Sequence, residues 1–368
     1  MSGWFAVQNV EEVPSPALLV YPNRVRENFR RMIRIAGGPS RLRPHIKTHK
    51  LPEIVRMQLD EGITKFKCAT IAEAEMAASA GAKDILIAYP VVGPNVARLL
   101  QLARAFPVTI FSCVTDDESA IRELSKVFSD SGLKLNVLLE LDCGQHRTGI
   151  EPGAAAARLY RLIATSAGLR PAGLHVYDGH IHDPDLAKRT ELCAAAFSPV
   201  NVFRRELVSA GLAVPRIVAG GTPTFPIHAK NDAYECSPGT CVLWDFGYAD
   251  NFADLDFLTA ALVLTRVVSK PGSNRLCLDL GHKAIAAENP PPRVQFPNLP
   301  DATALSHSEE HLVIETKGAD RFAVGDCLFG VPRHICPTVA LYSEASVVRD
   351  GRVTERWRIL ARDRRLTV

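Results

Sequence analysis

The sequence predicts an α/β fold, in which a (β/α)8 barrel of the TIM type is joined to a C-terminal antiparallel β domain. Three observations lead to this prediction. The chain has 368 residues, which leaves room for a second domain beside a barrel of about 250 residues. Short apolar runs alternate with helical patterns as far as residue 240, and strands that alternate with helices pair in parallel. After that point strand-like runs follow one another with few helical patterns between them, which is typical of antiparallel sheets.

Apolar runs supply a candidate for each of the eight barrel strands. Helical patterns rich in Ala, Leu, Glu and Arg separate these runs, for example at residues 71–80, where Gly81 is a natural C-terminal stop, and at residues 119–130. The apolar runs are residues 41–47, 66–70, 85–89, 108–114, 135–141, 172–177, 216–219 and 234–236.

The last third of the chain contains the candidate strands of the β domain. Residues 5–20 precede the first barrel unit and could add a strand to this domain. We therefore predict a barrel over residues 21–240 and a β domain built from residues 1–20 and 241–368. Its strand-like runs are residues 257–269, 274–280, 311–316, 326–329, 338–348 and 352–361.

Composition excludes several classes of protein. Hydrophobic residues make up 47% of the chain and charged residues 23%, which is the balance of a globular protein. The net charge is +3 and the basic residues are scattered, so we expect no nucleic-acid partner. No apolar stretch is long enough to span a membrane. The nine cysteines have no regular spacing, which favours a reduced, cytoplasmic protein over a disulfide framework.

Polar residues cluster directly after several of the predicted barrel strands. The clusters lie at residues 44–50, 140–149, 175–182, 220–224 and 237–240. Because the carboxyl ends of barrel strands meet at one face, where barrel enzymes place their active sites, we expect these residues to form the catalytic site.

Lys47 is the strongest single candidate in these clusters. A lysine at the end of a mostly buried strand lies in a cavity, and burial lowers its pKa toward the neutral amine that forms a Schiff base. The alternative is a lysine at the barrel rim that makes a salt bridge. Lys50 is a nearby competitor, but we expect it to belong to the following helix.

Two glycine-containing turns could bind a phosphate group. Gly220 and Gly221 would let backbone N–H groups approach an anion, and Thr222 adds a hydroxyl donor. Gly239 and Thr240 repeat this pairing after the next strand. The alternative is that these glycines only form tight turns.

A second possible site lies in the β domain. His334 and Cys336 are two residues apart in a segment that we expect to be extended, so their side chains should point to the same side. An imidazole and a thiolate form half of a metal site, although a buried cysteine beside a surface histidine would give the same pattern. His180 and His182 have the same spacing and could supply a general base or a further metal ligand.

Several groups of residues, taken in order along the chain, form a pattern that resembles the D-threonine aldolase and D-serine dehydratase family. These are fold-type III, alanine racemase-like enzymes, and the resemblance covers nearly the whole chain. The residues that carry it are Pro44, His45, Ile46, Lys47, Thr48, His49 and Lys50; Glu140, Asp142, Gly144, Arg147 and Gly149; His175, Tyr177, Asp178, Gly179 and His180; Gly220, Gly221 and Thr222; Ser237, Pro238 and Gly239; Asp279, Gly281, His282 and Lys283; and Pro332, His334, Cys336 and Thr338.

The resemblance implies that pyridoxal 5′-phosphate is bound covalently at Lys47. It also implies contacts to the cofactor ring from Arg147 and Tyr177, although Arg147 could instead pair with Glu140 or Asp142. Contacts to the cofactor phosphate would come from Gly221, Thr222, Gly239 and Thr240.

The resemblance further implies that His334 and Cys336 hold a divalent metal, namely zinc, manganese or magnesium, that acts on the 3-hydroxyl group of the substrate. The substrate would be a small D-amino acid, and the protein would be a homodimer. His182 or a metal-bound water is the candidate base for an aldolase reaction.

Two lyase reactions fit this resemblance. The first is aldol cleavage of D-threonine or a related D-3-hydroxy amino acid into glycine and an aldehyde. The second is dehydration of D-serine, D-threonine or a 3-hydroxyaspartate to a 2-oxo acid and ammonia. Many aldolase members have an acidic residue where Cys336 stands, while the dehydratases have cysteine. A non-catalytic cofactor carrier and a racemase are further alternatives.

Overall fold

The computed structural model describes residues 3–368, so Met1 and Ser2, which the predicted β domain includes, lie outside the described residues. Contacts divide the chain into two compact units. The sheet unit comprises the described part of Met1–Phe29 together with Thr48–Leu51 and Thr240–Arg362. The barrel unit comprises Arg30–Lys47, Pro52–Gly239 and Asp363–Val368. The division passes through helix α1 (Pro22–Ala36).

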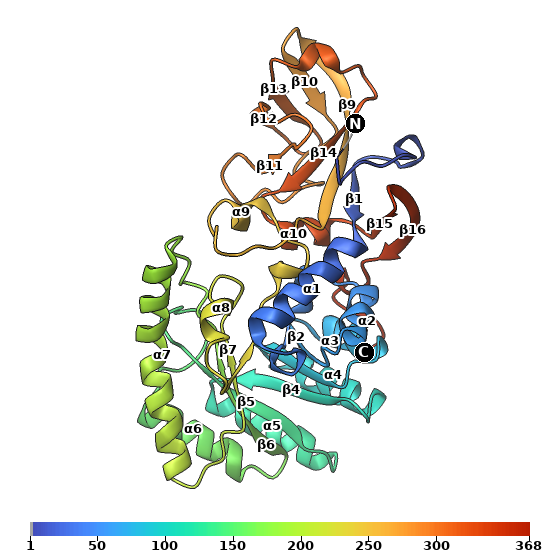
Figure 1. The fold of residues 1–368 in the computed structure, drawn as a ribbon. Coiled ribbons are helices and arrows are strands. Elements are labelled where there is room, and N and C mark those ends of the chain that lie inside the picture. The colour runs from blue at the N-terminus through green and yellow to red at the C-terminus, as the bar shows by residue number, and fades with distance from the viewer. Residues whose placement is uncertain (1–2) are drawn as a thin grey trace. The chain divides into compact units, whose positions relative to one another are not determined.

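The barrel unit contains a parallel sheet of seven strands in sequential order, from β2 to β8, with helices between successive strands (Figure 1). Parallel strands that alternate with helices are the arrangement predicted for this part of the chain, so the predicted fold class is confirmed. The strands are β2 (Lys65–Cys68), β3 (Asp84–Pro90), β4 (Ile110–Thr115), β5 (Leu135–Leu141), β6 (Leu169–Val176), β7 (Ile217–Ala219) and β8 (Tyr234–Cys236). The helices are α2 (Pro52–Asp60), α3 (Ile71–Ser79), α4 (Pro94–Ala105), α5 (Glu118–Asp130), α6 (Ala154–Thr165), α7 (Leu186–Ser209) and α8 (Phe225–His228).

The first predicted barrel strand, residues 41–47, is not a regular strand. Two single bridges, Leu42 with Cys236 and His45 with Lys67, join this segment to β8 and β2. The segment therefore occupies the eighth position of the barrel without a continuous ladder. Pro44 explains the difference, because proline has no amide hydrogen to donate to a ladder.

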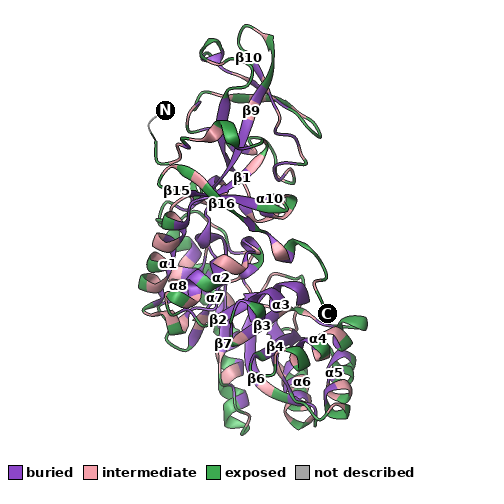
Figure 2. Cartoon of the chain, turned by 90° about the vertical axis from the view of Figure 1, so that its right-hand side faces the viewer, coloured by how far each residue is buried: buried purple, intermediate pink, exposed green. Residues whose placement is uncertain are grey.

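Burial explains why the other strands could be read from their apolar runs. Parallel strands are covered on both faces, and Figure 2 shows the strands of this unit as buried while the outer sides of α4 and α5 are exposed. In α5 the buried residues Ala120, Ile121, Leu124 and Phe128 recur every three or four positions. The Asp117 side chain accepts a hydrogen bond from the Ala120 amide and so begins this helix.

Arg43 ties the closing segment to the neighbouring strand β8 and to β3, the strand beyond β2. Its side chain is fully buried, and its guanidinium donates to Glu235 in β8 at 2.7 Å and to both oxygens of Asp84 in β3 at 2.8 and 3.0 Å. Burial alone would raise the pKa of both carboxyl groups, but Arg43 outweighs it and holds each pKa below its usual value.

The sheet unit is built on a nine-stranded mixed sheet in which β1 pairs parallel with β15 and antiparallel with β9. The extra strand expected from residues 5–20 is confirmed as β1. The strands are β1 (Ala17–Val20), β9 (Ala261–Gly272), β10 (Arg275–Leu278), β11 (Val294–Gln295), β12 (Thr303–His307), β13 (Leu312–Glu315), β14 (Cys327–Pro332), β15 (Glu344–Arg349) and β16 (Arg352–Arg358), and the helices are α9 (Phe246–Ala249) and α10 (Ile335–Leu341).

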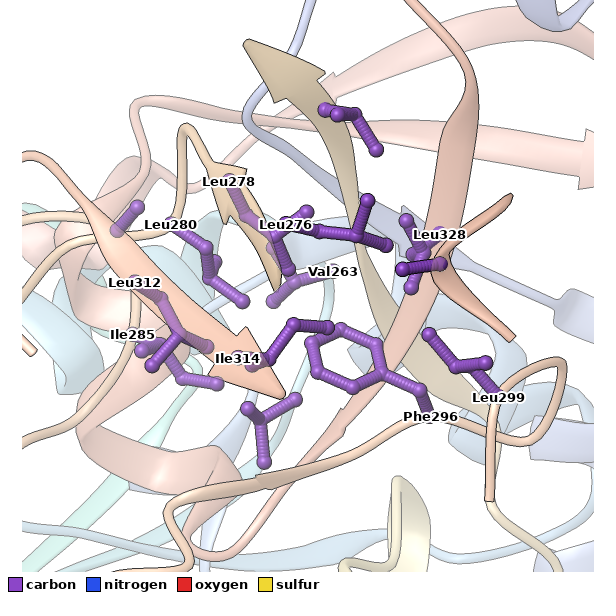
Figure 3. Packing of buried hydrophobic residues seen from close by; sticks show 14 residues of the cluster. Val263, Leu276, Leu278, Leu280, Ile285, Phe296, Leu299, Leu312, Ile314 and Leu328 are labelled. Carbon is purple, nitrogen blue, oxygen red and sulfur yellow. The ribbon is translucent and has the colours of Figure 1, made fainter. Parts of the chain in front are cut away.

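Two features of the sheet unit differ from the prediction. The predicted strand over residues 338–348 is wrong in its first part, where α10 runs to Leu341, and right in its second part, where β15 lies. The short strands β11 and β12 were not predicted. Figure 3 shows the core of this unit, where Phe296 packs among Leu276, Ile314 and Leu328.

Within residues 3–368, no helix is both long enough and apolar enough to cross a membrane.

Replacing Arg43 with methionine should lower the free energy of unfolding by about 3 kcal/mol, because Asp84 and Glu235, which are 19% and 16% exposed, would lose their buried partner and keep only the more exposed Arg216 and Lys65. Urea denaturation followed by circular dichroism measures this change. The control is Arg122→Met, which removes an exposed ion pair with Glu118 and should change the unfolding free energy by about 0.5 kcal/mol or less. Equal effects of the two substitutions would contradict the closing role of Arg43.

Candidate active site

A cavity of the barrel unit has a volume of about 460 Å³ and lies at the carboxyl ends of the strands. This volume is typical of a pocket for a small molecule or cofactor. Three residues predicted from the sequence, Lys47, Arg147 and Tyr177, line it together. Polar residues that were not predicted as site residues also line it, including Lys67 and His175.

Lys47 lies in a short 3-10 helix, Ile46–Thr48, at the end of the closing segment. The expectation that this lysine is buried is wrong, because its side chain is exposed. It makes no ion pair with any residue in the described part of the chain, so the rim salt bridge considered as an alternative does not form there. The amine is therefore accessible from the cavity for covalent chemistry.

Lys67 is the buried lysine of the cavity. It lies in β2 and is 2% exposed. Burial is the largest effect on its amine and the positive charge of Lys47 is the next, and together they lower the pKa of Lys67 to about 7. The sequence held a signal for this residue, since Lys67 lies inside the predicted apolar run over residues 66–70.

His175 and Glu140 are further buried polar groups beside the cavity. The Nδ1 atom of His175 lies 3.6 Å from Glu140 Oε1, beyond hydrogen-bond distance, and neither ring nitrogen has a partner among the described residues. Burial lowers the pKa of His175, which favours the neutral ring. For Glu140 burial would raise the pKa, but His175 and the hydroxyl of Thr148, which donates at 3.0 Å, outweigh it.

Arg147 faces the ring of Tyr177. The guanidinium carbon lies 5.1 Å from the ring centroid, within the range of a cation–π contact. The alternative pairing of Arg147 with Glu140 or Asp142 is not formed, because no ion pair joins these residues within the described chain. Asp142 instead contacts the ring of His146 at 2.8 Å.

The first glycine turn lies against the same tyrosine. Gly220 has a φ of +68°, a backbone conformation that favours glycine. A Cβ atom added to Gly221 would lie 3.0 Å from the Tyr177 ring. The hydroxyl oxygen of Thr222 accepts a hydrogen bond from the Gly239 amide at 3.2 Å, which joins the two predicted phosphate-binding turns. A Cβ atom at Gly221 would press against the ring, so the close approach of this turn to Tyr177 favours glycine.

A buried network holds this turn from behind. Asp178 accepts hydrogen bonds from Thr224 at 2.8 Å and from the His228 ring at 2.6 Å, and Thr224 accepts one from the Gly221 amide at 3.3 Å. Asp178, Cys193 and His228 are the described residues that form a group of three possible metal ligands. Both oxygens of Asp178 already have partners, so we interpret the group as support for the turn. Sequence reasoning missed His228 because its partner lies 50 residues away.

His334 and Cys336 lie in the sheet unit at the start of α10. His334 is the N-cap residue and Cys336 is in the helix, so the expectation of an extended segment is wrong. The Cys336 sulfur lies 3.2 Å from the Thr48 hydroxyl and 3.7 Å from the Thr240 hydroxyl.

The chemistry of these two donors suits a divalent metal. His334 Nδ1 lies 2.5 Å from Glu288, which leaves Nε2 for a metal and orients the ring as carboxylates do for ligating histidines. Burial would lower the pKa of His334, but Cys336 and Glu288 outweigh it and raise the pKa to about 9. Nitrogen and sulfur donors together favour zinc.

His180 and His182 are not among the residues that line the cavity. His182 is exposed, and His180 is half-buried beside Gly144. The role of His182 as a base therefore stays a prediction.

Two family models match successive parts of the chain. The model of the alanine racemase N-terminal domain matches residues 20–244. The model of the serine dehydratase domain matches residues 260–348.

Several proteins that this chain resembles along most of its length are named as aldolases. The chain is 35% identical to a D-threonine aldolase of Arthrobacter sp. over 87% of this chain and 85% of the relative. It is 28% identical to a 3-hydroxy-D-aspartate aldolase of Paracoccus denitrificans over 95% of this chain and 92% of the relative. The crystal structure of a D-threonine aldolase from Filomicrobium marinum superposes with a TM-score of 0.89 at 30% identity, and the match covers 95% of each chain.

Proposed function

We propose that this chain, which belongs to the alanine racemase-like family of pyridoxal-phosphate lyases, cleaves D-3-hydroxy amino acids such as D-threonine into glycine and an aldehyde. The observation that carries the proposal is the cavity in which an exposed Lys47 lies with Arg147 and Tyr177. The 35% identity to an aldolase across most of the chain favours aldol cleavage over the other reactions of the family.

We assign binding of the cofactor to the residues that the family resemblance implies. The Lys47 amine would bind the cofactor carbonyl, and Arg147 and Tyr177 would hold the ring. The turn at Gly221 and the hydroxyl of Thr222 would take the phosphate, with Gly239 as the second turn and Thr240 following it. When bound, pyridoxal phosphate supplies an electron sink for the bond that breaks at the substrate's α-carbon. An arginine stays protonated and keeps its protons, so Arg147 orients the ring without protonating it.

We assign the divalent metal to His334 and Cys336. A metal held there would lower the pKa of a hydroxyl group that coordinates it, which favours the alkoxide that an aldol cleavage needs. Glu288 would orient His334 through the contact at 2.5 Å. The ring nitrogens of His175, which have no partner among the described residues, could bind a polar group of the substrate inside the barrel unit.

Dehydration of a 3-hydroxy D-amino acid is the second candidate function. Two observations favour it, the serine dehydratase match over residues 260–348 and the cysteine at position 336. In this reaction Lys47 would remove the α-proton, and the hydroxyl would leave as hydroxide.

Replacing Lys47 with alanine should remove the visible absorption band that the purified protein acquires with pyridoxal phosphate, because no amine would remain to form the covalent bond. Lys50→Ala is the matched control and should keep the band. Absorption spectra of the two variants, taken after gel filtration, measure the outcome, and a band that survives in Lys47→Ala would exclude Lys47 as the cofactor lysine.

Replacing Cys336 with alanine should reduce activity by about a hundredfold or more, because the metal would lose one of its two protein ligands. The visible band should stay, since this substitution leaves Lys47 intact. The control is Cys277→Ala, which removes a half-buried cysteine from β10. Metal content by mass spectrometry, measured beside activity, separates the cases: full metal and full activity in Cys336→Ala would remove this residue from the site.

Product identification tests the choice between the two reactions. Incubation of the protein with pyridoxal phosphate, a divalent metal and D-threonine should yield glycine and acetaldehyde. Ammonia and 2-oxobutanoate would instead establish the dehydratase, and L-threonine as a product would indicate a racemase.

A further inference from the structure

Lys67 is a second amine in the cavity, and neither the motifs of the sequence nor the proposed cofactor contacts use it. It lines the cavity although the residue is only 2% exposed. Its Nζ atom lies 5.7 Å from the centroid of the Tyr177 ring, the same ring that Arg147 faces. Within residues 3–368, no carboxylate lies within ion-pair distance of Lys67 Nζ and no acceptor is in hydrogen-bond contact with it.

An ammonium group on a buried side chain without an acceptor is costly, because it has lost part of its water and gained no partner. Lysine can avoid this cost by losing its proton, as arginine cannot. The neighbouring arginines can therefore only hold charge, whereas Lys67 can change its charge. Its position at the cavity wall would place that change beside a bound molecule.

The charges that act on Lys67 lie on the closing segment, on β5 and after β6. Lys47 and Arg43, from the closing segment, repel a positive charge at Lys67. Glu140 in β5 and Asp178 after β6 attract one, but Asp178 is already committed to Thr224 and His228. Burial has a larger effect on the pKa of Lys67 than any of these charges. The pKa of the amine is therefore lowered to about 7.

We propose that Lys67 is the proton acceptor of the cavity, which takes a proton at Nζ from the ammonium group of an incoming amino acid or from Lys47 and later returns it. The proposal rests on the proposed function, since it assumes that amines exchange places on a carbonyl carbon in this cavity. It also supplies a base that lines the cavity, which His182 does not.

The proton transfer balances without any further reactant. One N–H bond of the donor ammonium breaks and one N–H bond forms at Lys67 Nζ. The donor nitrogen keeps the electron pair and can use it to attack the carbonyl carbon. When the covalent bond is reversed, Lys67 gives the proton back to the departing amine. A group whose pKa is near the working pH can do both steps efficiently.

Chemical rescue is the sharpest test, because a residue with a purely structural role would not be rescued. Lys67→Ala leaves a space the size of the missing side chain, and the pH dependence of pyridoxal-phosphate uptake by the apoprotein is followed by the visible band. At pH 7 uptake should be about a hundredfold slower than in the parent protein. Added ethylamine should restore it, and amines of different basicity should restore it to different extents. Lys83→Met removes an exposed lysine and should change nothing.

A direct titration keeps the proposal testable if Lys67→Ala does not fold. Lysines of the parent protein are reductively methylated with carbon-13, and the Lys67 signal, assigned with Lys67→Arg, is titrated by NMR. A midpoint near pH 7 supports the proposal, and a midpoint near the ordinary lysine value of about 10.4 overturns it. Uptake that is unchanged in a folded Lys67→Ala protein would overturn it as well.

These outcomes are distinct from a failure of the proposed function. If Lys47→Ala keeps the visible band, the cofactor assignment fails while the Lys67 titration can still give a midpoint near pH 7. If the band is lost in Lys47→Ala and the Lys67 titration is ordinary, the proposed function stands and only the role of Lys67 falls.

Discussion

The buried contact of Arg43 with Asp84 and Glu235 is the interaction on which the barrel site depends. The segment that closes the barrel has only two bridges to its neighbours, so it lacks the ladder that holds the other strands. A guanidinium presents several donors in a fixed plane and can bond to two carboxylates at once. It therefore joins the segment to β3, with which the segment has no bridge, and reinforces the single bridge to β8. Lys47 comes four residues after Arg43 in the same segment, so its placement at the cavity depends on this anchor.

The regular parts of the fold could be predicted because their causes are local. β5 has the predicted bounds, residues 135–141, since a parallel strand covered on both faces reads as one apolar run. The predictions failed where distant residues decide the structure. The start of α10 is one example, because Asp245 accepts a hydrogen bond from the Ile335 amide at 3.0 Å across 90 residues of sequence. Because Asp245 is so far away in the sequence, the residues near Ile335 do not indicate that a helix starts there. The local pattern alone predicts an extended segment.

The site shows the same division between local and distant causes. Its residues with distinctive spacing, such as Lys47 and Arg147, could be found from the family resemblance and do meet at one cavity. Which lysine is buried could not be found, because burial depends on all strands of the barrel together. The sequence suggested a buried Lys47, whereas Lys47 is exposed and Lys67, twenty residues later in the chain, is buried. The position of Lys67 inside an apolar run indicated that it could be buried. Whether its side chain faces the cavity depends on which side of β2 is turned toward the cavity, and the sequence does not show that.

The contrast between the two lysines suggests a physical reason for having both. An amine that forms a covalent bond with a carbonyl must be accessible and must move, and exposure gives Lys47 that freedom. An amine that exchanges protons near neutral pH must be shielded from water, because full hydration would keep its pKa near the ordinary value of about 10.4. One side chain cannot satisfy both requirements at the same time. Two lysines on adjacent segments of the barrel wall, joined by the bridge from His45 to Lys67, satisfy them separately.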